Sequence, residues 1–166
     1  MQLMTPAAPT AVDSALERDA AALHRALSEL VRAYQFRDRE QICCHDISVS
    51  QCYALEALVR RGPLTLNEVA AQLFLEKSTA SRMVDGLEAK GYLTRAPHPA
   101  DRRALQLAVT PAGRALYERI EAELVEQEMQ LLSRFQPEVR QALARLLGQL
   151  AEAAVSRLGG SCCNLD

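Results

Sequence analysis

The chain has 166 residues, of which 49% are hydrophobic and 24% charged, and its formal net charge is −2. This length suits one compact domain or two small modules, and the apolar content is enough for a core, which excludes a disordered chain. No apolar run approaches the roughly 18 to 20 residues that cross a bilayer. The first nine residues lack a basic segment followed by an apolar one, so we expect no secretory signal, no membrane contact and a cytoplasmic location.

Charge is distributed unevenly along the chain. Residues 60–110 carry a net charge of +3, whereas residues 1–59 carry −3 and residues 111–166 carry −2. A basic middle segment between acidic flanks predicts an anion-binding module held in a neutral-to-acidic frame.

The N-terminal part of the chain has a helical pattern. Apolar or aromatic residues recur there in steps of three and four: Leu16, Ala20, Leu23, Leu27, Leu30 and Tyr34. The pattern predicts a helix of about 25 residues that begins near Asp13 or Ser14. Because such a helix is long for a small chain, we expect it to pack against another subunit. Residues 42–48 break the pattern and are expected to form a connector.

Two shorter helices are expected next. The first covers about residues 49–60 and is ended by Gly62 and the proline that follows it. The second covers about residues 66–73, because Thr65 and Glu68 form the Thr-x-x-Glu pattern of a capping box.

A third short helix is expected from residue 77 or 78 to residue 90, with Gly91 in the position of a helix-ending glycine. Its apolar residues have the spacing of one buried face: Ala80, Val84 and Leu87. Small or polar residues occupy the opposite face: Ser78, Thr79, Ser81, Arg82 and Asp85.

The remainder of the chain predicts a hairpin and two long helices. Residues 92–95 and 105–109 alternate like paired strands, and the charged, turn-rich residues 97–103 join them. Thr110 followed by proline is typical of a helix start, so helices are expected at about 111–134 and 137–158.

The predicted fold is mainly α: a winged helix-turn-helix with long N- and C-terminal dimerisation helices and a two-stranded β wing. Residues 1–46 are expected to form an N-terminal arm and dimerisation helix, and residues 47–110 the DNA-binding domain. Residues 111–166 are expected to form the C-terminal dimerisation helices and a cysteine-containing tail.

The order of short helix, short helix and basic hairpin indicates binding of double-stranded DNA. The second short helix is small and polar on its exposed face, so it is expected to enter a major groove. Its candidate contacts are Lys77, Ser78, Thr79, Ser81 and Arg82. The hairpin is expected to lie along the backbone and to place Arg102 or Arg103 in or beside the minor groove.

Three stretches resemble the MarR family of bacterial regulators: LTLNEVAAQL at residues 64–73, KSTASRMVDGLEAKGYL at residues 77–93, and PADRR at residues 99–103. The Asp-x-Arg pattern of Asp101 and Arg103 is the most telling part. The resemblance implies a homodimer on a pseudo-palindromic operator, with Arg103 in the minor groove and oriented by an ion pair with Asp101. It also implies a transcriptional regulator, which we expect to be a repressor and not an enzyme.

Five cysteines include two adjacent pairs, Cys43-Cys44 and Cys162-Cys163. The expected helix directions bring both pairs near the junction of the dimerisation and DNA-binding parts. Converging thiolates suit a soft metal or metalloid ion or an iron–sulfur cluster, with His45 and Cys52 as further candidate ligands. We therefore predict that no cofactor is obligatory and that such an ion, on binding, releases the regulator from its operator.

Other roles for the cysteines stay open. Oxidation between the two pairs would act at the same junction, since a disulfide between adjacent cysteines is strained. A small aromatic ligand could bind there instead and leave the cysteines incidental. Cys43 and Cys52 can also be ordinary buried apolar residues without any sensory role.

Overall fold

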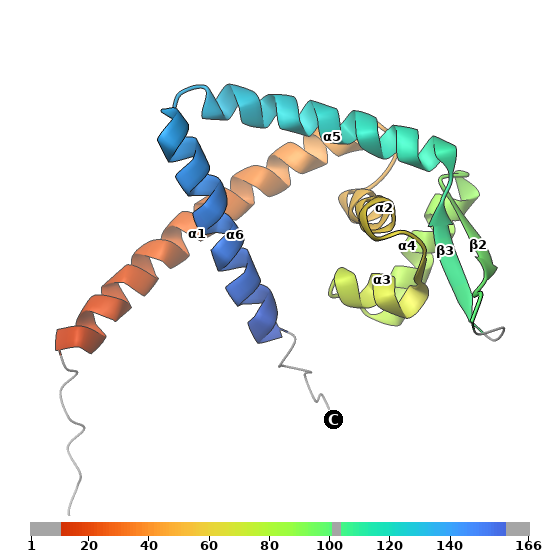
Figure 1. Cartoon of the computed structure of the whole chain (residues 1–166), viewed down its shortest axis with the longest axis horizontal. Helices are drawn as coiled ribbons and strands as arrows, with labels where there is room; N and C mark the ends of the chain where they lie inside the picture. The colour runs from red at the N-terminus through yellow and green to blue at the C-terminus, as the bar shows by residue number, and fades with distance from the viewer. Residues whose placement is uncertain (1–10, 101–103, 159–166) are drawn as a thin grey trace, which may run out of the picture. The chain divides into compact units, whose positions relative to one another are not determined.

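The computed structural model describes residues 11–100 and 104–158 (Figure 1). Its elements follow the predicted order, and the chain is mainly α-helical with a small antiparallel sheet, as a winged helix-turn-helix requires. The helices are α1 (Ala11–Cys43), α2 (Val49–Arg61), α3 (Leu66–Gln72), α4 (Lys77–Ala89), α5 (Pro111–Leu132) and α6 (Pro137–Leu158). The strands are β1 (Leu64–Thr65), β2 (Leu93–Pro97) and β3 (Leu105–Val109).

The chain forms two compact units, Met1–Glu121 and Ala122–Asp166, and the boundary falls within α5. The first unit holds α1 to α4, the sheet and the beginning of α5. The second holds the remainder of α5 and α6.

Helix α1 has 33 residues and continues to Cys43, so the prediction of about 25 residues and of a connector starting at residue 42 was wrong. The helix continues because Asp38 and Ile42 extend the inward-facing row in steps of four beyond Tyr34. Ile42 is fully buried and Asp38 is the buried charged residue of the described core. The connector to α2 therefore begins only after Cys43.

Asp38 anchors the end of α1 to α2. Its carboxylate accepts hydrogen bonds from the Arg37 guanidinium at 2.7 and 2.9 Å and from the Tyr53 hydroxyl at 3.1 Å. A buried carboxylate needs such partners, because an unpaired charge in the core is costly. Burial, together with the charge and the hydrogen bond of Asp38, raises the pKa of Tyr53 to about 12.

Capping boxes begin helices α2 and α3. Ser48 and Gln51 form the box of α2, which was not predicted although its Ser-x-x-Gln pattern is visible in the sequence. Thr65 and Glu68 form the predicted box of α3. Hydrogen bonds from the backbone N–H and hydroxyl of Thr65 lower the pKa of the Glu68 carboxyl.

Helix α3 ends at Gln72, one residue before the prediction, and the turn to α4 contains Phe74 with a φ of +52°. Helix α4 buries the three predicted residues and Met83 as well. The core that positions α4 is formed by large side chains from several elements: Leu55, Leu58, Val69, Leu87, Leu93 and Leu107.

The sheet has three antiparallel strands in the order β1-β3-β2, so the wing prediction missed β1. Two residues are too few to show an alternating pattern, and β1 exists only because Leu64 and Thr65 pair with Leu107 and Gln106 of β3. Strand β2 begins at Leu93 and extends to Pro97, slightly beyond the predicted segment.

A close backbone contact joins α5 to the hairpin. Thr110 caps the helix as predicted, since its hydroxyl accepts a hydrogen bond from the Gly113 N–H at 3.1 Å and donates one to the Gly91 carbonyl at 2.7 Å. A Cβ atom on Gly113 would lie 2.0 Å from the Tyr92 carbonyl oxygen. Only glycine therefore fits at this position.

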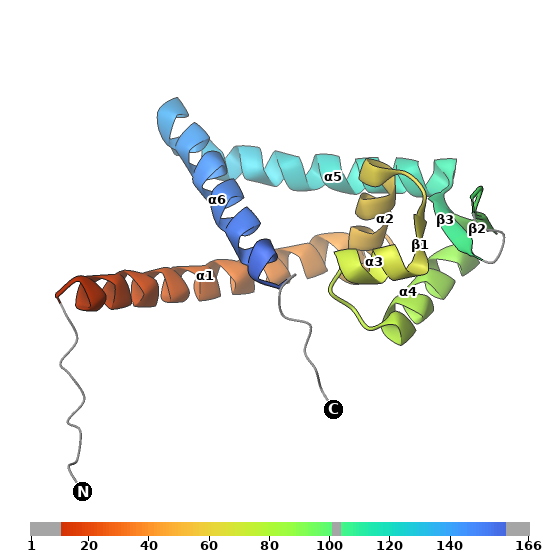
Figure 2. The same ribbon diagram turned by 60° about the horizontal axis from the view of Figure 1, so that its bottom comes forward.

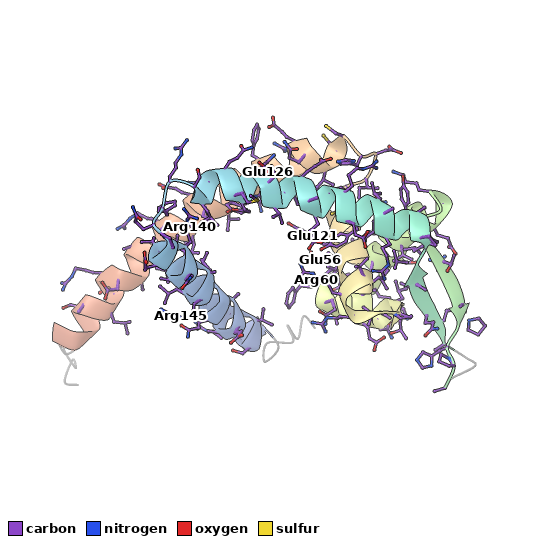
Figure 3. All side chains as sticks on the ribbon, turned by 45° about the horizontal axis from the view of Figure 1, so that its top comes forward. Glu56, Arg60, Glu121, Glu126, Arg140 and Arg145 are labelled. Carbon is purple, nitrogen blue, oxygen red and sulfur yellow. The ribbon has the colours of Figure 1, made fainter. Side chains whose placement is uncertain are left out.

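Helices α2 and α5 are also joined by a polar network, whose main members are labelled in Figure 3. The Arg60 guanidinium lies 3.1 Å from the Glu56 carboxylate and 3.2 Å from that of Glu121. The Tyr117 hydroxyl donates to the same Glu121 oxygen at 3.0 Å. Burial raises the pKa of Tyr117 to about 12.

Many large apolar side chains remain exposed in α1 and in the second unit. In α1 they are Leu16, Leu23, Leu30, Val31 and Phe36. In the second unit, whose α6 is seen most clearly in Figure 2, they are Val125, Met129, Leu131, Phe135, Val139, Leu143, Leu146, Leu147 and Val155. Within the described ranges, no helix is both long and apolar enough to span a membrane.

Candidate nucleic-acid interface and cysteine site

Helix α4 presents a polar face and an unusual N-terminus. Its N-cap residue, Glu76, makes no side-chain capping hydrogen bond, and its backbone carbonyl accepts hydrogen bonds from the N–H groups of Thr79 and Ala80. The side chains of Lys77, Ser78, Thr79 and Arg82 are exposed, whereas Ser81 is half-buried. A helix N-terminus without a side-chain cap and with a cation beside it is suited to an anion such as a phosphate.

A groove of about 410 Å³ lies between the beginning of α3, the beginning of α4 and the hairpin. Its polar lining includes Asn67, Lys77 and Arg95, and its apolar lining includes Leu105 and Leu107. The groove therefore joins the polar beginning of α4 to the wing.

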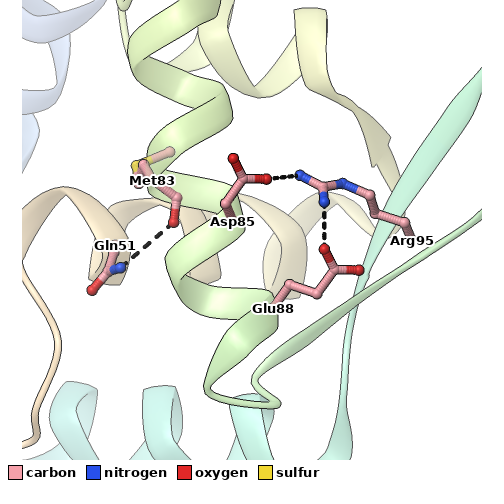
Figure 4. A network of polar contacts seen from close by, with 5 residues as sticks. All are labelled: Gln51, Met83, Asp85, Glu88 and Arg95. Atoms are coloured by element: carbon pink, nitrogen blue, oxygen red, sulfur yellow. Dashed lines mark hydrogen bonds and ion pairs between the residues drawn. The ribbon is translucent and has the colours of Figure 1, made fainter.

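Arg95 holds β2 against α4 (Figure 4). One terminal nitrogen of its guanidinium lies 2.5 Å from the Asp85 carboxylate, and the other donates to the Glu88 carboxylate. On the other side of α4, the Gln51 side-chain amide of α2 donates to the Met83 carbonyl at 3.5 Å. Neither Arg95 nor Glu88 was among the predicted site residues, because their ion pair joins two elements that no local pattern connects.

The predicted wing residues Asp101, Arg102 and Arg103 lie outside the described residues, so their roles stay predictions. The hairpin that carries them is closed by a backbone hydrogen bond of 3.0 Å from His98 to Ala104.

A short helix, a turn and a second helix with a polar outer face, followed by an antiparallel hairpin, define a winged helix-turn-helix protein. The MarR family model matches residues 45–104, which include α2, α3, α4 and strand β2 of the hairpin, and end one residue before β3. The chain belongs to the MarR family, which is a family of DNA-binding transcriptional regulators.

Individual relatives agree with this assignment. The chain is 32% identical over 151 residues to the transcriptional regulator PecS of Dickeya dadantii, covering 89% of this chain and 84% of that protein. It is 28% identical to the transcriptional repressor MdtR of Bacillus subtilis, covering 65% of this chain and 70% of that one. A MarR family structure from Bacillus stearothermophilus shares the fold, with a TM-score of 0.77, 24% identity and coverage of 83% and 96%.

Cys43 and Cys44 form an exposed pair at the end of α1. Both thiols donate to the carbonyl oxygen of Glu40, with sulfur–oxygen distances of 3.2 and 3.3 Å. The two sulfur atoms therefore lie around one oxygen atom, and His45 follows them directly in the connector.

Cys52 differs from this pair because it lies on α2 and its side chain is buried in the hydrophobic core. Burial raises the pKa of its thiol to about 12, and the nearby carboxylates of Glu56, Asp38 and Glu121 add to the shift. Cys162 and Cys163 lie outside the described residues. Between residues 11 and 158, apart from 101–103, no three cysteine, histidine or acidic side chains are placed to hold a metal ion. The metal site therefore stays a prediction.

The connector that follows the cysteine pair contacts α4. Asp46, with a φ of +59°, accepts a hydrogen bond from Lys90 through its backbone carbonyl, and its carboxylate lies 3.5 Å from the Lys90 ammonium. Lys90 is the C-cap residue of α4. No local pattern predicts this contact, because the two residues are far apart along the chain.

Proposed function

We propose that this chain is a homodimeric repressor that binds a pseudo-palindromic operator with one α4 in each of two major-groove half-sites. The observation that carries the proposal is the two-sided character of α4. Its apolar side is locked in the core, and Lys77, Ser78, Thr79 and Arg82 are exposed beside an N-terminus without a side-chain cap. Such a helix positions backbone amides and a cation for phosphates and a long arginine for base edges.

The exposed apolar side chains support the dimer. In α1 and in the second unit many large apolar side chains are exposed, and exposed apolar side chains in such number are typical of a subunit interface. Two copies of α4 are required for a palindromic site, with half-sites about 34 Å apart. The repressor MdtR is a precedent for repression among the relatives.

DNA binding is tested by selecting operator DNA from a genomic pool and measuring its dissociation constant by fluorescence anisotropy. Arg82→Ala is expected to weaken binding by about 5- to 100-fold and to relax the base preference at one position of each half-site. Arg103→Ala is expected to weaken it as well, through the minor groove. Arg119→Ala, on an exposed position of α5, is the matched control. Equal affinities of all four proteins would contradict the proposal.

For the signal, we propose that a thiophilic metal or metalloid ion binds Cys43 and Cys44 and lowers operator affinity. Two observations support the pair: both thiols are exposed, and both surround one carbonyl oxygen. Soft thiolate ligands select ions such as Cu(I), Hg(II) and As(III). Two cysteines leave such a site incomplete, and Cys162 and Cys163 are the proposed further ligands. The Asp46–Lys90 contact supplies a route to α4.

Titration of the protein–operator complex with Hg(II), arsenite and hydrogen peroxide tests this signal. Release by the metals is expected to disappear in Cys43→Ser/Cys44→Ser and to weaken in Cys162→Ser/Cys163→Ser. Cys52→Ala is the matched control and is expected to respond like the unmodified protein. If the metals still release the Cys43→Ser/Cys44→Ser protein from its operator, the metal proposal is overturned. Release by peroxide alone would favour oxidation, and release by an aromatic compound in every cysteine variant would make the cysteines incidental.

A further inference from the structure

We infer that Arg95 is a positioning residue that holds the β2–β3 hairpin at a set angle to α4, so that wing and recognition helix meet DNA as one preformed surface. The inference rests on the proposed DNA contact of α4 and the hairpin, and adds a residue that the family assignment does not supply. Arg95 itself does not touch DNA in this proposal.

The geometry of the contact carries the inference. Arg95 lies in the middle of β2, opposite Leu107 of β3. Its planar guanidinium reaches two carboxylates on one side of α4, Asp85 at 2.5 Å and Glu88 through the second terminal nitrogen (Figure 4). Two bonds from one rigid group to side chains about one helical turn apart restrict rotation of the strand relative to the helix, which a single ion pair would not do.

The hairpin needs this restraint because only its base is packed. Leu93 and Leu107 are 1% exposed and fix the beginning of β2 and the middle of β3 in the core. Beyond Arg95, Ala96 of β2 pairs only with Gln106 of β3, and β1 supports β3 no further than Gln106, which pairs with Thr65. The side chains of Pro97 and Leu105 are exposed. The outer part of the hairpin therefore has little apolar contact that would set its direction.

The charges around Arg95 argue against a direct role in phosphate binding. Although Arg95 lines the groove beside α4, both of its terminal nitrogens are occupied by carboxylates. Two acidic groups around one cation give this spot a net negative charge, which repels a phosphate. Lys77, which lines the same groove, has no ion pair within residues 11–100 and 104–158 and is the contrasting residue.

The first test compares the salt dependence of operator binding for Arg95→Gln and Lys77→Ala. A residue that contacts a phosphate lowers the slope of log K against log salt by about one when it is removed, whereas a positioning residue leaves the slope unchanged. We expect Arg95→Gln to weaken binding by about 10-fold with an unchanged slope. An unchanged affinity, or a slope reduced by about one, would overturn the inference.

A double-mutant cycle gives the second test. In an Asp85→Ala/Glu88→Ala background the ion pairs are already absent, so Arg95→Gln is expected to change affinity less than about 2-fold. Arg95→Gln is likewise expected to add little to Arg103→Ala, because positioning the wing matters only while the wing binds DNA. A full additional loss in either background would show that Arg95 acts on DNA or on general stability, and would contradict the inference.

Two controls separate the inference from folding and from the proposed function. Thermal unfolding establishes that each variant is folded. The Asp85→Ala/Glu88→Ala protein keeps good helix formers in α4 and removes the same two ion pairs, so its operator affinity tests the inference even where Arg95→Gln alone unfolds. If Lys77→Ala and Arg82→Ala lower operator affinity and Arg95→Gln does not, only the inference about Arg95 is refuted. No effect of any of these variants would refute the proposed DNA contact itself.

Discussion

Lys90 at the end of α4 donates a hydrogen bond to the backbone carbonyl of Asp46 in the α1–α2 connector and forms an ion pair with the Asp46 carboxylate. Because Asp46 lies three residues after Cys43, the contact joins the exposed cysteine pair to α4 through a short, hydrogen-bonded piece of chain. The Asp46 N–H also donates to the Cys43 carbonyl at 3.3 Å. A change in the conformation of the cysteines is therefore expected to reach α4 through this contact.

The first prediction follows from that connection. Lys90→Met keeps a long side chain but removes the ammonium, so operator affinity without metal is expected to change by less than about 3-fold. The fold-change in affinity on adding Hg(II) is expected to shrink, because the ion no longer acts on α4 through Asp46. Anisotropy titrations with and without Hg(II) measure both quantities, with Arg119→Met as the control. An undiminished Hg(II) response would show that the signal takes another route.

The second prediction concerns two helical glycines that differ in what surrounds them. Gly113→Ala places a Cβ against the Tyr92 backbone carbonyl, which cannot move without shifting the hairpin, and is expected to lower the free energy of unfolding by about 3 kcal/mol. Gly86→Ala meets only the end of the flexible Gln51 side chain, which can shift at the cost of its long hydrogen bond of 3.5 Å to the Met83 carbonyl. Its expected effect is within about 1 kcal/mol of zero, since alanine also favours the helix. Urea denaturation of both variants checks the contrast, and equal effects would contradict it.

The third prediction concerns the reactivity of the described cysteines. Cys43 and Cys44 are exposed, whereas Cys52 is buried and its pKa is raised to about 12. Since the thiolate is the reacting species, iodoacetamide at pH 8 is expected to modify Cys43 and Cys44 at least about 100 times faster than Cys52. Peptide mass spectrometry of timed samples measures the rates. In urea the three rates should converge, and a fast reaction of Cys52 in the folded protein would contradict its placement in the core.

The fourth prediction is a loss of stability in alkaline solution. Burial is the leading cause that raises the pKa values of Cys52, Tyr53 and Tyr117, each to about 12. Below pH 9 these groups are protonated in both the folded and unfolded states, so they add no pH dependence there. Above pH 9 for Cys52, and above pH 10 for the tyrosines, the unfolded chain releases protons first and stability falls until about pH 12.

Urea denaturation between pH 8 and pH 11 measures this decline. Each group contributes at most about 1.4 kcal/mol per pH unit, and partial exposure of the tyrosines reduces their share. Cys52→Ala is expected to be less stable than the unmodified protein at pH 8 but to lose less stability between pH 9 and pH 10. An identical pH dependence of the two proteins would mean that Cys52 does not titrate with a raised pKa.

The winged helix-turn-helix could be predicted because local signals and tertiary packing agree in that part of the chain. The Thr65–Glu68 capping box, the buried row Ala80, Val84 and Leu87, and the Thr110 cap are short-range patterns, and the structure contains all of them. The polar residues of α4 are exposed for the same reason, with Ser81 as the half-buried exception. Helical periodicity alone was therefore enough to locate the candidate recognition surface.

The contacts that hold this surface in place could not be predicted in the same way. Strand β1 exists through its pairing with β3, and α1 is longer than expected because Asp38 and Ile42 find partners in the core. The partners of Arg95 and Lys90 come from other elements, and no local pattern names them. The unequal roles of the cysteines also depend on burial, which separates Cys52 from Cys43 and Cys44.

The amino-acid sequence by itself determined the order of the helices, the hairpin, the polar face of α4 and membership of the MarR family. These features depend on residues close together in the chain, whose spacing and capping preferences act before any long-range contact forms. Only the tertiary structure decided that Arg95 joins the hairpin to α4, that Lys90 joins α4 to the connector after the cysteine pair, and that Cys52 is shielded. Those outcomes depend on which distant side chains the packed core brings within hydrogen-bonding distance, and sequence spacing carries no record of that.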